Sequence, residues 1–194
     1  MKRLVCIVEG EGEVEAMPHL CARALVHLGI YHWRVDPSPI RWPRSKLVDE
    51  RARSPSRPPH FEGIAGAMAL ARRRPADAVL LLVDSDDDCP VHWGPAAAEA
   101  ASRLLPSVAV MAVREYESWL LESFPAETLL ALGLAGPASE RRGAKELLKK
   151  LVPGYKPTTH QLAITRTIDL AAVRGRSESF DKLMRSIEQV CRPA

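Results

Sequence analysis

The first 120 residues alternate between short apolar runs and longer segments with apolar residues at helical spacing. The short apolar runs lie at residues 3–8, 33–36, 78–83 and 107–113. Runs of this kind are typical of strands buried on both faces of a parallel sheet. The segments with helical spacing lie between them, at residues 14–28, 61–74 and 95–105. This alternation predicts an α/β fold with a parallel sheet of about four strands flanked by helices.

The pattern changes near residue 124, after which no strand-like run occurs. A further helix is expected to begin at Arg114, directly after the last strand. The later amphipathic segments are helical and lie at residues 143–151, 159–173 and 179–190. We therefore expect residues 1–122 to form the α/β domain and residues 123–194 to form a helical extension packed on it.

A run of carboxylates follows the third predicted strand. Val79 to Val83 lead directly into Asp84, and the sequence continues as SDDD to residue 88. If the chain stays extended, Asp84 and Asp86 point to the same side, and the next two aspartates begin a turn. Crowded carboxylates repel one another unless a cation lies between them, and oxygen ligands of this type suit Mg²⁺. The alternative is an acidic turn that caps the next helix.

Further carboxylates follow two other predicted strands. Glu9 ends the first strand, and Glu115 and Glu117 follow the last. The carboxyl ends of parallel strands share one edge of the sheet, so these side chains are expected near Asp84 and Asp86. Metal-assisted phosphoryl transfer is the chemistry that needs such a set. The alternatives are a helix-terminus role for Glu115 and an ion pair between Glu117 and Arg114 or a distant base.

Basic residues gather in a proline-rich stretch at residues 37–60. The formal net charge of +3 is mild and does not by itself indicate a nucleic-acid partner. A nuclease nevertheless needs cations for a polyanion, and this stretch interleaves six with Trp42. The candidate nucleic-acid contacts are Arg41, Arg44, Lys46, Arg51, Arg53 and Arg57. The alternative for these residues is a solvated surface.

The cysteines and the N-terminus bear on location. The four cysteines are scattered without C-x-x-C spacing, which favours buried thiols in a reducing cytosol over disulfides or a zinc site. The apolar run near the N-terminus is too short for a signal peptide or a membrane span. We expect a cytoplasmic protein without a membrane partner.

The segments around these acids resemble the TOPRIM domain, in which a Glu follows the first strand and an Asp-x-Asp follows a later one. More closely, they resemble a small bacterial TOPRIM-like family of unassigned function, related to the OLD (overcoming lysogenization defect) nucleases of anti-phage conflict systems. The resemblance runs from Val8 to about Leu183. The matching blocks are EGEGEVEAMPHL, LVDSDDDCP, REYESWLL, GAKELL, KPTTHQ and RSESFDKL.

The resemblance implies a TOPRIM-like, Rossmann-like fold and a Mg²⁺- or Mn²⁺-dependent endonuclease acting in phage defence. It assigns the TOPRIM glutamate role to Glu9 and metal-ligand roles to Asp84 and Asp86. Relatives of the OLD type use further acids and a Lys. Here these are Glu13, Glu115 and Glu117 for the acids and Lys145, with Lys156 as the alternative, for the Lys.

The resemblance also bears on partners. OLD proteins carry an ATPase in the same chain, but this sequence lacks a P-loop motif, so an ATPase is expected as a separate partner. The expected substrate is nucleic acid, with DNA favoured over RNA, and a homodimer remains an open option. Two other functions stay open: a non-catalytic nucleic-acid or partner-binding module, and a phosphoryl-transfer enzyme that acts on nucleotides.

Overall fold

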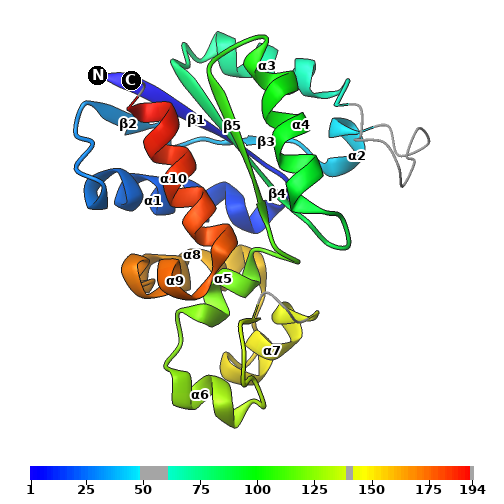
Figure 1. Ribbon diagram of the computed structural model, residues 1–194, viewed down its shortest axis with the longest axis vertical. Helices are drawn as coiled ribbons and strands as arrows, with labels where there is room; N and C mark the ends of the chain where they lie inside the picture. The colour runs from blue at the N-terminus through cyan, green and yellow to red at the C-terminus, as the bar shows by residue number, and fades with distance from the viewer. Residues whose placement is uncertain (49–60, 139–141, 193–194) are drawn as a thin grey trace.

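A computed structural model describes residues 1–48, 61–138 and 142–192. Its centre is a sheet in which every recorded strand pair is parallel. The sheet order is β2-β1-β4-β5, and the short β3 pairs with β1 beyond the end of β2 (Figure 1). The strands are β1 (Lys2–Val8), β2 (Trp33–Val35), β3 (Ile40–Arg41), β4 (Ala78–Asp84) and β5 (Ser107–Ala112).

Alternate residues along the strands bury side chains on opposite faces of the sheet, as the pleat requires. In β4, Leu80 and Leu82 join one hydrophobic cluster, whereas Val79 and Leu81 join the other. Because both faces are buried, the strands are nearly continuous apolar runs, which explains the pattern in the sequence.

Helices cover both faces of this sheet (Figure 1). On one face, α1 (Glu11–His27) and α10 (Glu178–Cys191) contribute to the cluster that contains Leu80. On the other face, α3 (Ile64–Arg73) and α4 (Pro90–Ser102) pack over Leu81. The chain leaves β1 toward β2 on one side, and later adds β4 and β5 on the other. The order therefore reverses between β1 and β4, where open α/β sheets place their ligands.

The remaining helices lie mainly at the end of the sheet where β4 and β5 finish (Figure 1). Of these, α8 packs along α1, and α5 contacts both α7 and α8. The hydrophobic cluster under α10 continues into this group through residues such as Trp119 and Leu148. The bounds are α2 (Arg44–Leu47), α5 (Glu117–Glu122), α6 (Ala126–Ala131), α7 (Ala144–Leu151), α8 (Pro157–Thr167) and α9 (Leu170–Arg176).

The structure confirms the predicted fold class and refines four elements. The helix expected to begin at Arg114 begins at Glu117, because the φ of 66° at Arg114 is not helical. The two-residue β3 lies in the proline-rich stretch and was not expected. Helix α4 begins at Pro90 rather than at residue 95, because proline fits the first turn of a helix. The helix expected at 159–173 is divided by extended backbone at Ile168, after which Asp169 caps α9 by accepting two backbone N–H bonds. In the described part of the chain, no helix is long and apolar enough to span a membrane.

Candidate functional site

Four carboxylates gather near the point where the strand order reverses. Glu9 follows β1 directly, Asp84 is the last residue of β4, Glu13 lies in the first turn of α1, and Glu117 begins α5. Glu13 and Glu117 are buried, at 7% and 3% exposure. Electrostatic repulsion acts from Glu9, Glu13 and Glu117 on Asp84. We call these four residues the acid cluster.

Asp84 is held in place by the backbone of the neighbouring strand's loop. The Tyr116 N–H donates to Asp84 Oδ1 at 2.8 Å. Burial raises the pKa of Asp84 well above its ordinary value, and the charges of Glu13, Glu117 and Glu9 raise it further. The hydrogen bond from Tyr116 opposes this rise. Ionised Asp84 is therefore costly in this position without a cation beside it.

Glu13 is fixed by the turn between β1 and α1. The Gly10 N–H donates to Glu13 Oε2 at 2.6 Å. A Cβ atom at Gly10 would lie 2.7 Å from Glu13 Oε1, so a larger residue at position 10 would displace the Glu13 carboxylate. Burial raises the pKa of Glu13, and the Gly10 hydrogen bond opposes it. The charges of Glu117 and Glu9 raise this pKa further.

Glu117 is the member of the acid cluster with a cation beside it. Lys145 Nζ lies 3.8 Å from Glu117 Oε1, and the Tyr155 hydroxyl donates to the same oxygen at 3.3 Å. Burial raises the pKa of Glu117, and Lys145 opposes the rise. The partner is thus the distant base rather than Arg114. Of the two candidate lysines, Lys145 lies at the site, whereas the Lys156 backbone precedes α8 and pairs with the His160 ring.

Asp86 does not join Asp84, because the chain turns between them. Asp86 has a φ of 46°, in the left-handed region, so the extended alternation expected from the sequence ends at Ser85. The Asp86 side chain is 69% exposed and lies 3.8 Å from Arg44 Nη1. The Asp88 N–H closes the turn by donating to the Ser85 carbonyl at 2.7 Å. The expectation that Asp87 and Asp88 belong to the turn is thus confirmed, and Asp86 belongs to it too.

The three predicted nucleic-acid contacts that the structure describes, Arg41, Arg44 and Lys46, do not form one free basic surface. Arg44 is only 10% exposed and donates to the Asp84 carbonyl at 2.9 Å; it also pairs with Asp88 and stacks on Trp93. Arg41 pairs with Glu11 at 3.2 Å. Arg44 therefore stabilises the structure around the site, whereas the Arg41–Glu11 pair is exposed and contributes little to stability. The Lys46 ammonium lies over the Trp42 ring.

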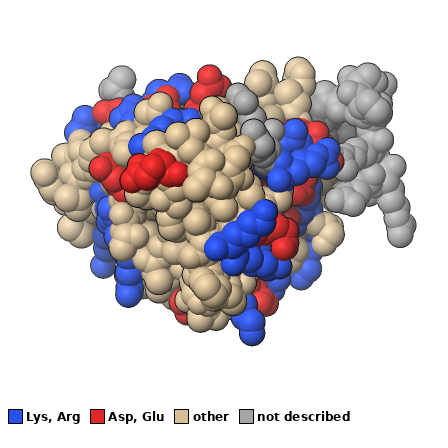
Figure 2. All heavy atoms as spheres, turned by 90° about the horizontal axis from the view of Figure 1, so that it is seen from below, with Lys and Arg blue, Asp and Glu red and all other residues tan. Residues whose placement is uncertain are grey.

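The other three predicted contacts, Arg51, Arg53 and Arg57, lie outside the described residues. Figure 2 shows one face of the molecule, on which Lys and Arg side chains lie beside Asp and Glu side chains. Among the described residues in that view, positive charge occurs in separate groups rather than in one continuous band.

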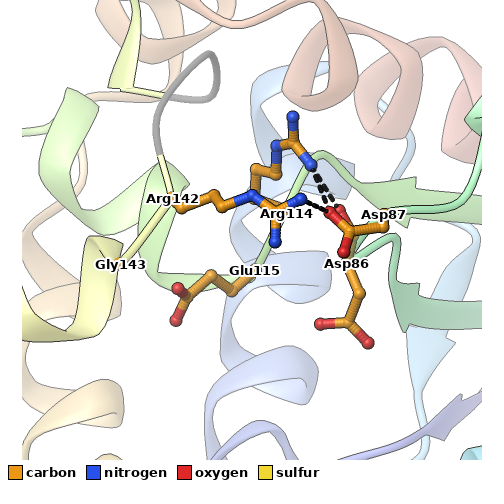
Figure 3. Close-up of a pocket in the computed structure, with 6 residues that line it drawn as sticks. All are labelled: Asp86, Asp87, Arg114, Glu115, Arg142 and Gly143. Carbon is orange, nitrogen blue, oxygen red and sulfur yellow. Dashed lines mark hydrogen bonds and ion pairs between the residues drawn. The ribbon is translucent and has the colours of Figure 1, made fainter.

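Glu115 lines a neighbouring cavity of about 320 Å³, and its charge also raises the pKa of Glu117 in the acid cluster. The cavity is also lined by Asp86, Asp87, Arg114 and Arg142 (Figure 3). The structure therefore divides the predicted acids into two groups: Glu9, Glu13, Asp84 and Glu117 in the acid cluster, and Asp86 and Glu115 at the cavity.

The chemistry of the acid cluster fits a hard divalent cation, since buried carboxylates that raise one another's pKa are oxygen ligands in need of positive charge. Within the described ranges, however, no three His, Cys, Asp or Glu side chains are already arranged to hold one ion. The donor set therefore fits a cation by the type and charge of its ligands.

The contacts that two tyrosines make at the site had not been predicted. The Tyr116 backbone anchors Asp84, and the Tyr155 hydroxyl binds Glu117. Arg114 and Arg142 both reach Asp87. Arg114 follows a predicted strand directly, which is a signal that could have identified it. No local pattern marks Tyr155, because its contact depends on how α7 and α8 pack.

Comparison with known families gives one result over nearly the whole chain. Residues 8–188 match a family described as a domain of unknown function, DUF4276. No curated protein and no solved structure matches the chain. The matched range contains the acid cluster, Lys145 and the residues around the cavity. The chain therefore belongs to the DUF4276 family.

Proposed function

We propose that this chain is a divalent-metal-dependent nuclease that hydrolyses phosphodiester bonds of nucleic acid at the acid cluster. The observation that carries the proposal is the burial of mutually repelling carboxylates where the strand order reverses. Such repulsion costs stability, and strongly perturbed acids concentrate at functional sites. The resemblance to TOPRIM-like nucleases, in which Glu9 and Asp84 have matching positions, supports the same function.

The residues at the site have three roles in this proposal: holding the cation, orienting its ligands and neutralising charge on the substrate. Glu9, Glu13, Asp84 and Glu117 would hold Mg²⁺ or Mn²⁺, and the bound cation would supply charge stabilisation at phosphate oxygens and an acidified water. The Tyr116 N–H fixes the orientation of Asp84, and the Gly10 N–H fixes that of Glu13. Lys145, half-exposed beside Glu117, is positioned to neutralise charge on a phosphate or on the leaving oxygen.

Asp86 and Glu115 have a different place in this proposal. They lie at the adjoining cavity rather than in the acid cluster, so they would border the substrate rather than form the first set of ligands. Phage defence, a separately encoded ATPase partner and a preference for DNA rest on the family resemblance alone.

Cleavage of plasmid DNA with added Mn²⁺ tests the proposal. Asp84→Asn keeps an acceptor for the Tyr116 N–H but removes the charge, and we expect at least a hundredfold loss of cleavage. Asp77→Asn is the matched control, because Asp77 precedes the same strand at its other end and accepts a backbone N–H from Arg3 at 2.7 Å. Full cleavage by Asp84→Asn would exclude the acid cluster as the catalytic site.

One observation favours a second candidate, a non-catalytic nucleic-acid or partner-binding module. No three metal-ligating side chains within the described residues are prearranged for one ion. A module of this kind would bind neither Mg²⁺ nor Mn²⁺ in a calorimetric titration. A nuclease held inactive by a missing partner would still bind the cation, so the titration separates the two.

A further inference from the structure

We propose that Arg114 and Arg142 form a phosphate-binding pocket beside the acid cluster, and that Asp87 occupies it when no ligand is bound. The inference takes its nucleic-acid ligand from the proposed nuclease function, but the pocket itself is argued from geometry. Two guanidinium groups from distant segments converge on one carboxylate: Arg114 Nη1 lies 2.8 Å from Asp87 Oδ1, and Arg142 pairs with the same oxygen.

The arrangement in Figure 3 separates the charges within the cavity. The guanidinium groups of Arg114 and Arg142 turn toward Asp87, whereas the carboxylates of Asp86 and Glu115 point away from the arginines. One side of the cavity of about 320 Å³ is therefore positive apart from Asp87. Guanidinium groups bind phosphate oxygens through paired hydrogen bonds, which suits this side to a phosphate group.

The Asp87 pairs are exposed enough to exchange with a ligand. The Asp87 side chain is 58% exposed and that of Arg142 is 71% exposed. Exposed ion pairs contribute at most about 1 kcal/mol, so an incoming polyanion could replace the carboxylate. Arg44 differs, because its buried guanidinium pairs with Asp88 and stacks on Trp93, which makes it a structural contact.

The backbone at Arg114 also indicates a constrained binding residue. Arg114 has a φ of 66°, which is uncommon for a residue with a side chain and costs roughly 1 kcal/mol or more. The conformation is held by the Ser85 hydroxyl, which accepts from the Arg114 N–H at 2.8 Å, and by the Asp86 carbonyl, which accepts from its guanidinium at 3.0 Å. These contacts fix the guanidinium at the cavity, two residues before the anchor of Asp84.

Binding without catalysis tests the pocket. In EDTA, the full chain is titrated into a fluorescein-labelled 12-nucleotide DNA strand, and inorganic phosphate is titrated separately by calorimetry. Asp87→Asn removes the carboxylate that pairs with the two arginines, and it is expected to tighten binding about fivefold. This factor corresponds to the free energy of one exposed ion pair. Arg142→Gln is expected to weaken DNA binding and to reduce the magnitude of the slope of log K against log salt by about 0.7, the value for one phosphate contact on a single strand.

Asp181→Asn is the matched control, because Asp181 also holds two arginines, Arg174 and Arg185, each at 2.7 Å, but on α10 away from the cavity. If Asp87→Asn binds DNA more tightly but not inorganic phosphate, the pocket is assigned to a nucleic-acid backbone. If it binds inorganic phosphate more tightly but not DNA, the pocket is assigned to free phosphate. Unchanged binding of both ligands, or an equal gain from Asp181→Asn, overturns the proposal.

The outcome is independent of hydrolysis. If Asp87→Asn gains affinity and the wild type shows no metal-dependent cleavage, the phosphate-binding pocket is supported and the nuclease function is contradicted. If cleavage depends on Asp84 and Asp87→Asn does not change binding, the nuclease function is supported and the phosphate-binding pocket is contradicted.

Discussion

At the scale of single residues, the acid cluster contains buried carboxylates whose mutual repulsion lowers the stability of the folded protein. Asp84 has two like-charged neighbours, Glu13 and Glu117, that burial has also desolvated. The backbone N–H groups of Tyr116 and Gly10 orient two of these carboxylates without neutralising them. This is the pattern expected where stability is given up for function.

Removing one of these charges should therefore stabilise the cation-free protein. We expect Asp84→Asn to raise the free energy of unfolding at pH 7 by about 1 kcal/mol, because an amide keeps the Tyr116 hydrogen bond and ends the repulsion. Urea unfolding in EDTA measures this, with Asp77→Asn as the control that should not stabilise. A loss of stability in Asp84→Asn would contradict the account of Asp84.

The pH dependence of stability follows from the same shifts. Because the folded-state pKa of Asp84, Glu13 and Glu117 is raised, the folded chain binds more protons than the unfolded chain between the two pKa values. Stability should therefore fall as pH rises from about 4, the ordinary carboxyl pKa, through the raised values. Urea unfolding over a pH series in EDTA should show this fall, and a smaller one in Asp84→Asn. An equal fall in both would remove Asp84 as a cause.

At the scale of elements, the contact between α1 and α8 holds the acid cluster against the helical group. Gly12 lies in the first turn of α1, and a Cβ there would overlap the Gln161 side-chain amide and lie 2.8 Å from Pro157 Cβ. One turn beyond Gln161, Thr165 and the buried Tyr116 hydroxyl share a hydrogen bond of 3.0 Å. The position of α8 therefore influences the segment that anchors Asp84.

Gly12→Ala should separate these two helices. We expect a loss of about 2 kcal/mol in unfolding free energy, as for other overpacked sites, and partial recovery when Gln161→Ala is added. Gly175→Ala in α9 is the control, since nothing lies within 4 Å of a Cβ there and alanine favours a helix. Thermal unfolding of the variants measures these changes in stability. An equal change in stability for Gly12→Ala and Gly175→Ala would exclude the close packing of α1 and α8.

The sequence predicted the sheet better than it predicted the site. The apolar runs of β1, β4 and β5 are visible because both faces of the sheet are buried, and parallel strands bring their ends together. The strand ends also brought Glu9 and Asp84 to the same region. Asp86 was misplaced, because a left-handed residue within a run of aspartates leaves no distinct periodic signal. The contact of Tyr155 with Glu117 joins residues 38 positions apart and depends on tertiary packing.

At the scale of the whole molecule, the helices after residue 122 complete the sheet as well as extend it. Helix α10 packs on β5, and Phe180, Leu183 and Ile187 are fully buried in the cluster that also contains Leu80. A chain ending at residue 122 would keep α1 on this face but would expose the part of the sheet that α10 covers, above all β5. Contiguous exposed apolar surface of this kind is rare on soluble monomers.

We therefore expect residues 1–122 alone not to form a cooperatively folded protein. Circular dichroism during thermal unfolding should show no cooperative transition for this fragment, whereas the full chain should show a single one. A cooperative transition in the fragment would mean that the α/β region folds independently of α10.

Asp84 is the residue on which the account depends at each scale. It ends β4 of the central sheet, it belongs to the acid cluster, and it is anchored by Tyr116, whose hydroxyl binds Thr165 of α8. Calorimetric titration of Mn²⁺ into the full chain at pH 7 tests the proposed cation binding most directly. We predict saturable binding by the wild type and by Asp77→Asn, and binding at least tenfold weaker by Asp84→Asn. Absence of binding by the wild type, or equal affinity in Asp84→Asn, would contradict the proposal that the acid cluster is a metal site.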